Sequence, residues 1–241
     1  MPIVTHAISD RALMIETTRG YLELTPYTPQ TIRVRFRATP DFCPEPGPIV
    51  TAQPDPAIRF VVQESPDQLL VATDTLKIVI DRQTEAFHYY DREGRLLTRE
   101  PARGGKTLEP IDVYVSRFDD VDVVESHDNA DGVRFEAQDV RTEVDRQAFH
   151  TRLAFEWAPD EALYGLGSHE EGMFNLRGQN QYLYQQNMKA VVPVLVSTRG
   201  YGVFFNSCSS MTFHDDAFGS YVWSDVDDEL VFDGDPEALW D

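Results

Sequence analysis

The sequence contains only two cysteines, Cys43 and Cys208, and they stand far apart. Two cysteines are too few for a disulfide framework, and such sparse use is typical of proteins in a reducing compartment. The first residues lack a basic stretch followed by an apolar run, so no secretory signal is expected. No segment approaches the roughly 18 consecutive apolar residues of a transmembrane helix. We therefore expect a cytoplasmic protein with no membrane partner.

Positive charge is also scarce, because 21 Lys and Arg stand against 41 Asp and Glu, giving a formal net charge of −20. Duplex DNA and anionic membrane surfaces bind through clustered basic side chains, so we expect no nucleic-acid partner. A neutral ligand would be indifferent to this charge. The stretch from Gly200 to Asp241 has no basic residue and many acids, which favours a solvated face over a cation site.

Motifs for cofactors, metals and nucleophiles are incomplete. Gly165-Leu166-Gly167 lacks the third glycine and the strand–turn–helix context of a dinucleotide site. The clusters at 168–171 and 214–216 lack the spacing of metal ligands, and 225–229 lacks the glycine that a calcium loop needs at its sixth position. We therefore predict no cofactor, no metal and no catalytic triad.

Helical periodicity is nearly absent, whereas alternation with a period of two runs through most of the chain. Thr31–Arg37 is the clearest case, with apolar side chains on one face and three arginines on the other, as in a half-buried strand. Short strands separated by turns predict an all-β fold, a single large antiparallel β-sandwich. The other expected strands are Leu76–Ile80, Ala86–Tyr90, Arg95–Leu97, Ile111–Phe118, Val121–Val124, Val133–Glu136, Phe149–Trp157, Val191–Val196, Gly202–Asn206, Met211–His214, Ser220–Trp223 and Glu229–Phe232.

Turn chemistry places the connections. The prolines between Pro40 and Pro56 predict a loop or an edge, and Asp91–Gly94 predicts a turn. Ser197–Tyr201 is expected to close a hairpin. Pro193 lies inside an apolar run and predicts that this strand is at an edge or contains a bulge.

The segment from Tyr164 to Asn187 differs from the rest of the chain because it is rich in glycine, amides and aromatic side chains. Such a loop suits sugar recognition, since flat rings cover the C–H faces of a sugar while Arg, Asn and Gln bond its hydroxyls. An ordinary long surface loop explains the composition equally well. The residues alone leave both readings open.

An ordered set of motifs resembles the N-terminal domain of glycoside hydrolase family 31, which holds α-glucosidases and α-xylosidases. The set consists of Tyr164-Gly165-Leu166-Gly167, Asn175-Leu176-Arg177-Gly178, Gln186-Asn187, and Val192–Ser197 running into Arg199–Val203. The strand at Ile32–Phe36 and the meander from Leu76 to Leu97 are similar to that domain in order and spacing. Ser168 departs from the glutamate that many members carry there, so no carboxylate role is transferred to it.

The resemblance implies a galactose-mutarotase-like β-sandwich that packs beside a (β/α)₈ barrel and reaches over its active-site mouth. Retaining enzymes of this kind use two aspartates, one as nucleophile and one as acid and base. Neither aspartate motif is present, and the chain is too short to hold a barrel as well. We expect residues 1–232 to form the N-terminal sandwich domain and residues 233–241 a divergent acidic tail, with the catalytic barrel absent and this chain inactive alone.

No residue of this chain is therefore expected to be catalytic. The resemblance implies partners of two kinds, an oligosaccharide or α-glycoside substrate and the catalytic barrel domain of the same enzyme. Substrate-binding candidates are hydrogen-bonding residues of the loop: Arg177, Gln186 and Asn187, with His169 and Gln185 behind them.

Two rival functions stay open from the sequence. One is a stand-alone carbohydrate-binding sandwich with an exposed aromatic platform. The other is a mutarotase-like aldose epimerase, which needs a histidine and a carboxylate as acid and base. A large exposed apolar surface would favour the accessory domain, because a missing barrel interface leaves such a patch bare.

Overall fold

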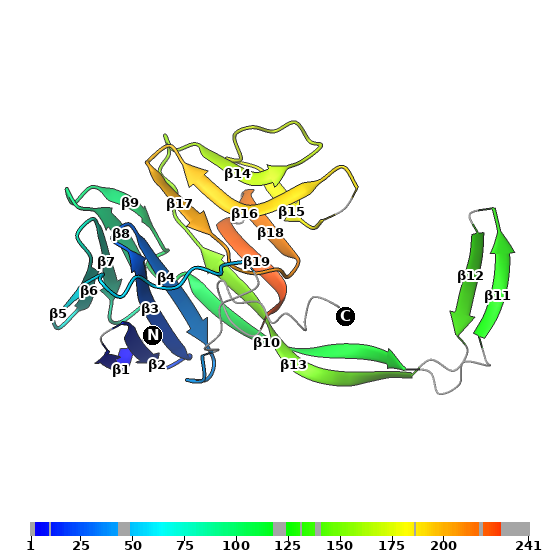
Figure 1. Cartoon of the computed structure of the whole chain (residues 1–241), viewed down its shortest axis with the longest axis horizontal. Helices are drawn as coiled ribbons and strands as arrows, with labels where there is room; N and C mark the ends of the chain where they lie inside the picture. The colour runs from blue at the N-terminus through cyan, green and yellow to red at the C-terminus, as the bar shows by residue number, and fades with distance from the viewer. Residues whose placement is uncertain are drawn as a thin grey trace.

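A computed structural model describes residues 3–9, 11–42, 49–117, 124–130, 132–137, 141–185, 187–216 and 219–227, with the backbone alone for 124–129, 132–137 and 223–227. All strand pairs among these residues are antiparallel, and the described residues form no helix (Figure 1). The all-β sandwich prediction is thus confirmed. Among the described residues, no helix has the length and hydropathy needed to cross a bilayer.

The first sheet has the order β1-β2-β3-β4, with β1 Ile3–Ile8, β2 Leu13–Thr17, β3 Tyr21–Thr28 and β4 Thr31–Arg37. The strand predicted at Thr31–Arg37 is confirmed. Its arginine face is less solvated than the alternation suggested, because Arg35 is only 6% exposed. Arg35 lies opposite Glu23 in register, and its Nη2 donates to Glu23 Oε1 at 2.8 Å. The buried cation is thus paired, as burial of a charge requires.

The second sheet is a meander in sequence order. It consists of β5 Val61–Glu64, β6 Gln68–Ala72, β7 Leu76–Asp81, β8 Phe87–Asp91 and β9 Leu96–Arg99. The predicted turn at Asp91–Gly94 is confirmed: Gly94 has a φ of 82°, and the Asp91 carboxylate accepts a hydrogen bond from the backbone N–H of Arg95 at 2.8 Å. The described parts of the proline-rich stretch from 40 to 56 contain no strand, also as predicted.

The third sheet has the order β10-β13-β19-β18-β15. Its strands are β10 Lys106–Arg117, β13 Arg141–Ala154, β15 Asn180–Leu183, β18 Met211–Asp216 and β19 Gly219–Asp227. β11 Val124–Asn129 and β12 Gly132–Ala137 form a separate hairpin. Residues 118, 121–123 and 229–232 of the expected strands lie outside the described residues, as does the predicted tail at 233–241, so the domain boundary at 232 stays a prediction.

The fourth sheet has the order β14-β16-β17, with β14 Leu163–Ser168, β16 Ala190–Ser197 and β17 Tyr201–Phe204. The predicted hairpin at Ser197–Tyr201 is confirmed. The edge-strand alternative for Pro193 is wrong, since β16 is central, but the bulge alternative is confirmed. Gly165 pairs with Leu195 and Gly167 with Val191, so Pro193 lies where the ladder is interrupted and its missing N–H costs no bond.

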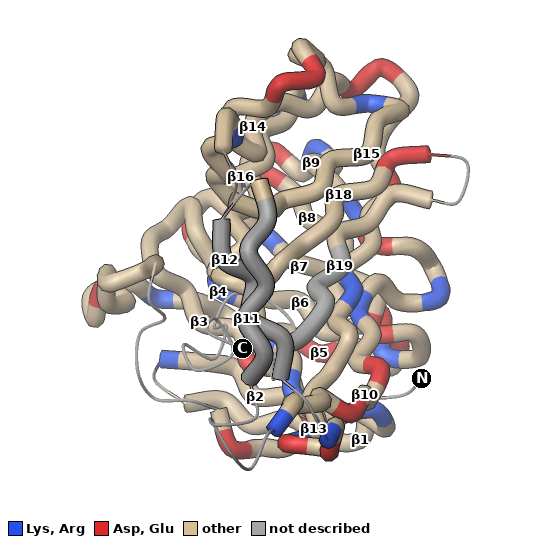
Figure 2. Tube along the Cα trace, turned by 90° about the vertical axis from the view of Figure 1, so that its right-hand side faces the viewer, with Lys and Arg blue, Asp and Glu red and all other residues tan. Residues whose placement is uncertain are grey.

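A common core joins the sheets. Figure 1 shows β1–β9 in one half of the sandwich and β14–β19 in the other, and buried apolar side chains from all four larger sheets form one cluster between them. Fully buried members include Phe36, Phe87, Leu163 and Phe213. In Figure 2, Lys and Arg are intermixed with Asp and Glu along the tube instead of forming a basic face.

Candidate functional site

Gly165-Leu166-Gly167 forms a kink in β14 that only glycine allows at two positions. The three residues have φ angles of 109°, 61° and 100°. A Cβ added to Gly165 would lie 2.2 Å from the carbonyl oxygen of Val194, and one on Gly167 would lie 2.0 Å from that of Ala190. The kink turns Leu166 fully into the core. These glycines therefore shape the backbone before the loop.

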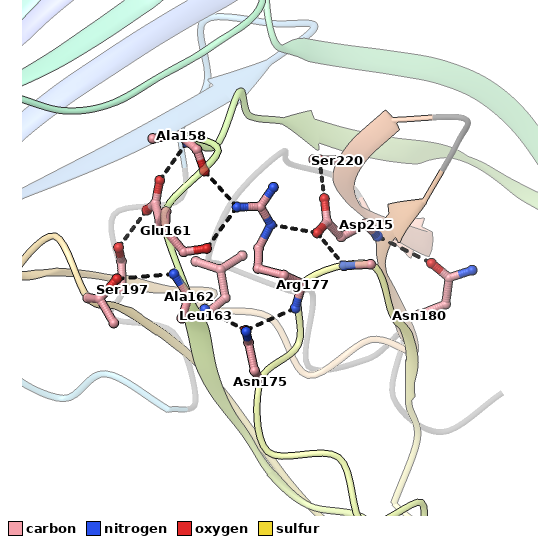
Figure 3. Close-up of polar contacts among 12 residues, drawn as sticks. Ala158, Glu161, Ala162, Leu163, Asn175, Arg177, Asn180, Ser197, Asp215 and Ser220 are labelled. Atoms are coloured by element: carbon pink, nitrogen blue, oxygen red, sulfur yellow. Dashed lines mark hydrogen bonds and ion pairs between the residues drawn. The ribbon is translucent and has the colours of Figure 1, made fainter.

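Asn175 fixes the middle of the loop between β14 and β15 (Figure 3). Its Oδ1 accepts hydrogen bonds from the backbone N–H groups of Leu163 and Arg177, both at 3.2 Å. The backbone N–H of Leu176 also donates to the Leu163 carbonyl at 2.8 Å, and the Leu176 side chain is buried. The loop is thus attached at its centre to the start of β14.

Arg177 is held in a network of protein acceptors. Its Nε donates to Asp215 Oδ2 at 2.7 Å, and its Nη1 donates to the carbonyl oxygens of Ala158 and Glu161 at 2.8 and 2.9 Å. Asp215 also accepts from the backbone N–H of Gly178 at 2.7 Å. Figure 3 shows the guanidinium between these groups. Arg177 therefore joins the loop to β18 and to the turn before β14.

Glu161 is the second buried carboxylate of this region, and its side chain is fully buried. Its Oε1 accepts from the Ser197 and Tyr201 hydroxyls, both at 2.5 Å, while Oε2 accepts from the Ala158 N–H at 2.8 Å. Burial, and then the hydrogen bond to Glu161, raise the pKa of Tyr201 well above its ordinary value. The phenol therefore remains a hydrogen-bond donor at neutral pH and ties the turn to β17.

Gln185 closes the loop between β15 and β16. Its Nε2 donates to the Lys189 carbonyl at 2.6 Å, and its Oε1 accepts from the Val191 N–H at 3.0 Å. Lys189 Nζ donates to Glu171 Oε1 at 2.6 Å, which links this loop to the preceding one. That hydrogen bond is the main cause of the lowered pKa of Glu171.

The remaining predicted residues differ in their surroundings. His169 Nε2 lies 2.8 Å from the carbonyl oxygen of Leu166, to which its N–H donates. Asn187 is exposed and makes no hydrogen bond with the described residues. Gln186 lies outside the described residues. The substrate-binding role of these residues and of Arg177 and Gln185 stays a prediction, with Asn187 the one described member whose amide is unused.

Large exposed apolar side chains concentrate around these loops, a feature that the sequence analysis did not assign residue by residue. Phe174 is 83% exposed and Met188 73%, although both are large and apolar. Six such residues, which we call the apolar outer surface, are Met173, Phe174, Met188, Val192, Val196 and Phe204. The sequence contained part of this signal, because the residues of β16 are apolar on both faces of the strand.

A cavity of about 640 Å³ lies between the sheets, and Tyr201 and Phe204 form part of its wall. Its wall includes Glu100 and Lys106, which are 0% and 2% exposed, with Lys106 Nζ 2.5 and 2.6 Å from the two carboxylate oxygens. Burial raises the pKa of Glu100 and lowers that of Lys106, while their mutual attraction opposes both shifts. The pair is internally satisfied, and the described lining contains no histidine. It offers no histidine–carboxylate couple of the kind an epimerase uses.

The described part of the chain shows no cluster of metal-ligating side chains. No group of three or more His, Cys, Asp or Glu among these residues could hold a metal ion. Cys208 is a free thiol, and Cys43 lies outside the described residues.

Comparison with known proteins identifies a family for this chain. Residues 21–214 match the glycosyl hydrolase 31 N-terminal galactose mutarotase-like domain. An uncharacterized family 31 glucosidase of Pseudescherichia vulneris is 24% identical over 195 residues, covering 78% of this chain and 33% of the relative.

Solved structures show the same fold. The α-xylosidase of Xanthomonas citri has a TM-score of 0.65 at 25% identity, covering 85% of this chain and 19% of that protein. The dextranase of Flavobacterium johnsoniae has a TM-score of 0.67 at 15% identity, covering 99% and 27%. The chain thus spans a third or less of the length of these relatives. The chain, whose matched region contains the kinked β14, Arg177 and the two loops flanking β15, belongs to the N-terminal galactose-mutarotase-like domain family of glycoside hydrolase family 31.

Proposed function

We propose that this chain is the N-terminal accessory domain of a retaining α-glycosidase of the α-glucosidase or α-xylosidase type. The observation that carries the proposal is the family match over residues 21–214 in a chain that spans a third of its curated relative. Relatives named as a glucosidase and as an α-xylosidase support the substrate class, an α-glycoside or oligosaccharide. Bond cleavage belongs to a catalytic barrel domain, and this domain alone is inactive.

The apolar outer surface is the proposed contact with the barrel. Val192 and Val196 are four residues apart in β16 and are 48% and 47% exposed, whereas Leu195 and Ser197, the neighbours of Val196, are buried. Phe204, on the adjacent β17, is 37% exposed, and Phe174 extends the surface into the loop. Contiguous exposed apolar side chains of this kind mark interaction surfaces, since leaving them in water forfeits about 25 cal/mol for each Å² that a partner could cover.

The two loops flanking β15 are the proposed contribution to the substrate site. Hydrogen bonds of Asn175, Gln185 and Lys189 restrain the described parts of these loops, which reduces the entropy lost when a ligand binds. Asn187 carries an unused amide, which donates and accepts hydrogen bonds and suits sugar hydroxyls. Gln186 stands beside it in sequence, while Arg177, Gln185 and His169 support the loops and contact the sugar as hydrogen-bond partners, none acting as acid or base.

The test is reconstitution. The purified chain is assayed on p-nitrophenyl α-glucoside and α-xyloside, alone and mixed with a separately expressed family 31 barrel that lacks its own N-terminal domain. We expect no turnover by the chain alone and increased turnover by the mixture. Turnover by the chain alone, or a barrel that neither binds the chain nor responds to it, would refute the proposal.

Variants locate the interface. Phe174→Asp combined with Val196→Asp is expected to abolish the barrel response, because two carboxylates would be buried without partners. Val61→Asp is the matched control, since Val61 is 57% exposed on the distant β5. Equal loss in both variants would show that the apolar outer surface is not the contact.

A further inference from the structure

The outer face of the third sheet, β10-β13-β19-β18-β15, carries aromatic side chains at its β15 edge. Along β15, Gln181 and Leu183 are each 3% exposed and face the core, whereas Tyr182 is 51% exposed. Tyr184 directly follows the strand and is 48% exposed. The ring centroids of Tyr182 and Tyr184 are 5.8 Å apart with an interplanar angle of 15°. The two stacked rings thus form a flat apolar surface in solvent.

A second stack lies on the same face, over β18, β19 and β13. The rings of His214 and Tyr221 are 4.6 Å apart at 23°, and Arg152 Cζ lies 3.8 Å from the centroid of the Tyr221 ring. Arg152 lies on β13 and His214 on β18, and β19 runs between these strands, so Tyr221 lies between the other two. Guanidinium–aromatic stacking of this kind orients the Arg donors sideways.

Arg152 has no carboxylate partner among the residues whose side chains the structure describes. Among the described residues it makes no hydrogen bond or ion pair, and its Nε is buried without an acceptor. At the other end of the stack, Asp216 Oδ2 accepts from Asn180 Nδ2 at 2.9 Å and lies 3.8 Å from His214 Nδ1. The face therefore combines flat rings with unused donors, the chemistry that recognises hydroxyl groups.

The strand register connects the two stacks. Tyr182 pairs with Thr212, Thr212 with position 223, and position 223 with Arg152. Three inter-strand steps of about 4.8 Å place Tyr182 roughly 14 Å from Arg152. Figure 2 views the chain from the side on which β15, β18 and β19 lie. A ligand that contacts both stacks must therefore be extended.

We propose that this face, which we call the aromatic face and define by Tyr182, Tyr184, His214, Tyr221 and Arg152, binds a neutral oligosaccharide. The net charge of −20 disfavours a polyanionic chain, and the absence of a deep apolar pocket among these residues disfavours a lipid-like ligand. The choice of saccharide rests on the proposed function. The site includes Tyr184 at the start of the loop after β15 and extends across the sheet to Arg152, so it holds a polymeric substrate that continues from that loop.

The test is calorimetric titration of the full chain with maltoheptaose, isomaltoheptaose and a xyloglucan heptasaccharide, with an oligogalacturonate as the anionic comparison. We expect one of the neutral probes to bind and the oligogalacturonate not to bind. Tyr182→Ala and Tyr184→Ala are each expected to weaken binding about tenfold, and Arg152→Gln to weaken it by a similar factor. Tyr114→Ala is the matched control, because Tyr114 is 62% exposed on β10 outside the aromatic face.

Several results would overturn the assignment: no binding of any neutral probe, binding of the oligogalacturonate alone, or equal effects of Tyr182→Ala and Tyr114→Ala. Circular dichroism melting of each variant separates lost binding from lost folding, and the exposed tyrosines keep the test valid where Arg152→Gln fails to fold. The result is independent of reconstitution. A barrel that fails to respond removes the proposed function while the saccharide titration still decides the aromatic face, and the reverse also holds.

Discussion

Replacing Arg177 by alanine separates a structural role from a ligand-binding role. The guanidinium donates three hydrogen bonds, to Asp215 and to the carbonyl oxygens of Ala158 and Glu161. The Asp215 side chain is only 8% exposed. Arg177→Ala therefore leaves the Asp215 carboxylate nearly buried, with the Gly178 N–H and the Ser220 hydroxyl as its remaining donors.

The magnitude follows from burial. Removing one partner of a buried ion pair costs about 3–5 kcal/mol, because the other charge remains unpaired. The Arg177 side chain is 26% exposed and Asp215 keeps two donors, so we reduce this to about 2–3 kcal/mol. For a domain of this size the melting temperature should fall by roughly 4–12 °C.

Urea denaturation followed by circular dichroism measures the effect, with the m-value checked for two-state behaviour. Arg99→Ala is the matched control, since Arg99 pairs with Glu156 at the same 2.7 Å distance but with side chains 48% and 42% exposed. Surface pairs contribute about 0–1 kcal/mol, so this variant should lose little stability. Equal losses in the two variants, or a loss below about 0.5 kcal/mol for Arg177→Ala, would refute the structural role derived above.

Two further predictions concern the kink and the buried phenol. Gly167→Ala should destabilise the domain by more than about 1 kcal/mol, because its Cβ would lie 2.0 Å from the Ala190 carbonyl oxygen at a φ of 100°; Gly200→Ala, where a Cβ meets nothing within 4 Å, should cost less in the same urea titration. The pKa of Tyr201 is raised in the folded state above the ordinary tyrosine value of 10.0, so the stability this phenol contributes is full below pH 10 and declines as the pH rises beyond it. Tyr201→Phe should flatten that decline in unfolding experiments between pH 8 and 11, and an unchanged slope would contradict the raised pKa, whose largest cause is burial of the phenol.

Local patterns were sufficient for most strands because a half-buried strand requires alternation in the sequence itself. Thr31–Arg37 and the turn at Asp91–Gly94 needed no long-range information. The interruption at Pro193 was also predictable, since proline lacks the N–H of the ladder. Its central position was not, because strand order depends on which distant segments pair.

The loop residues illustrate the opposite limit. The composition of the loop around Arg177 suggested sugar recognition. The partners of Arg177, which are Asp215, Ala158 and Glu161, lie up to 38 residues away in sequence. Only the fold shows that this guanidinium is engaged with the protein. The aromatic face has the same origin: Tyr182 and Arg152 are 30 residues apart in sequence and meet only through three strand pairings.

The sequence by itself determined the all-β class, the turns, the family resemblance and the absence of cofactor motifs, because each depends on periodicity, on backbone chemistry or on short ordered motifs. The tertiary structure alone decided which polar side chains are used internally, which apolar ones stay in solvent, and which rings stack. Those properties depend on burial and on contacts between residues distant in the chain, and no local pattern contains them.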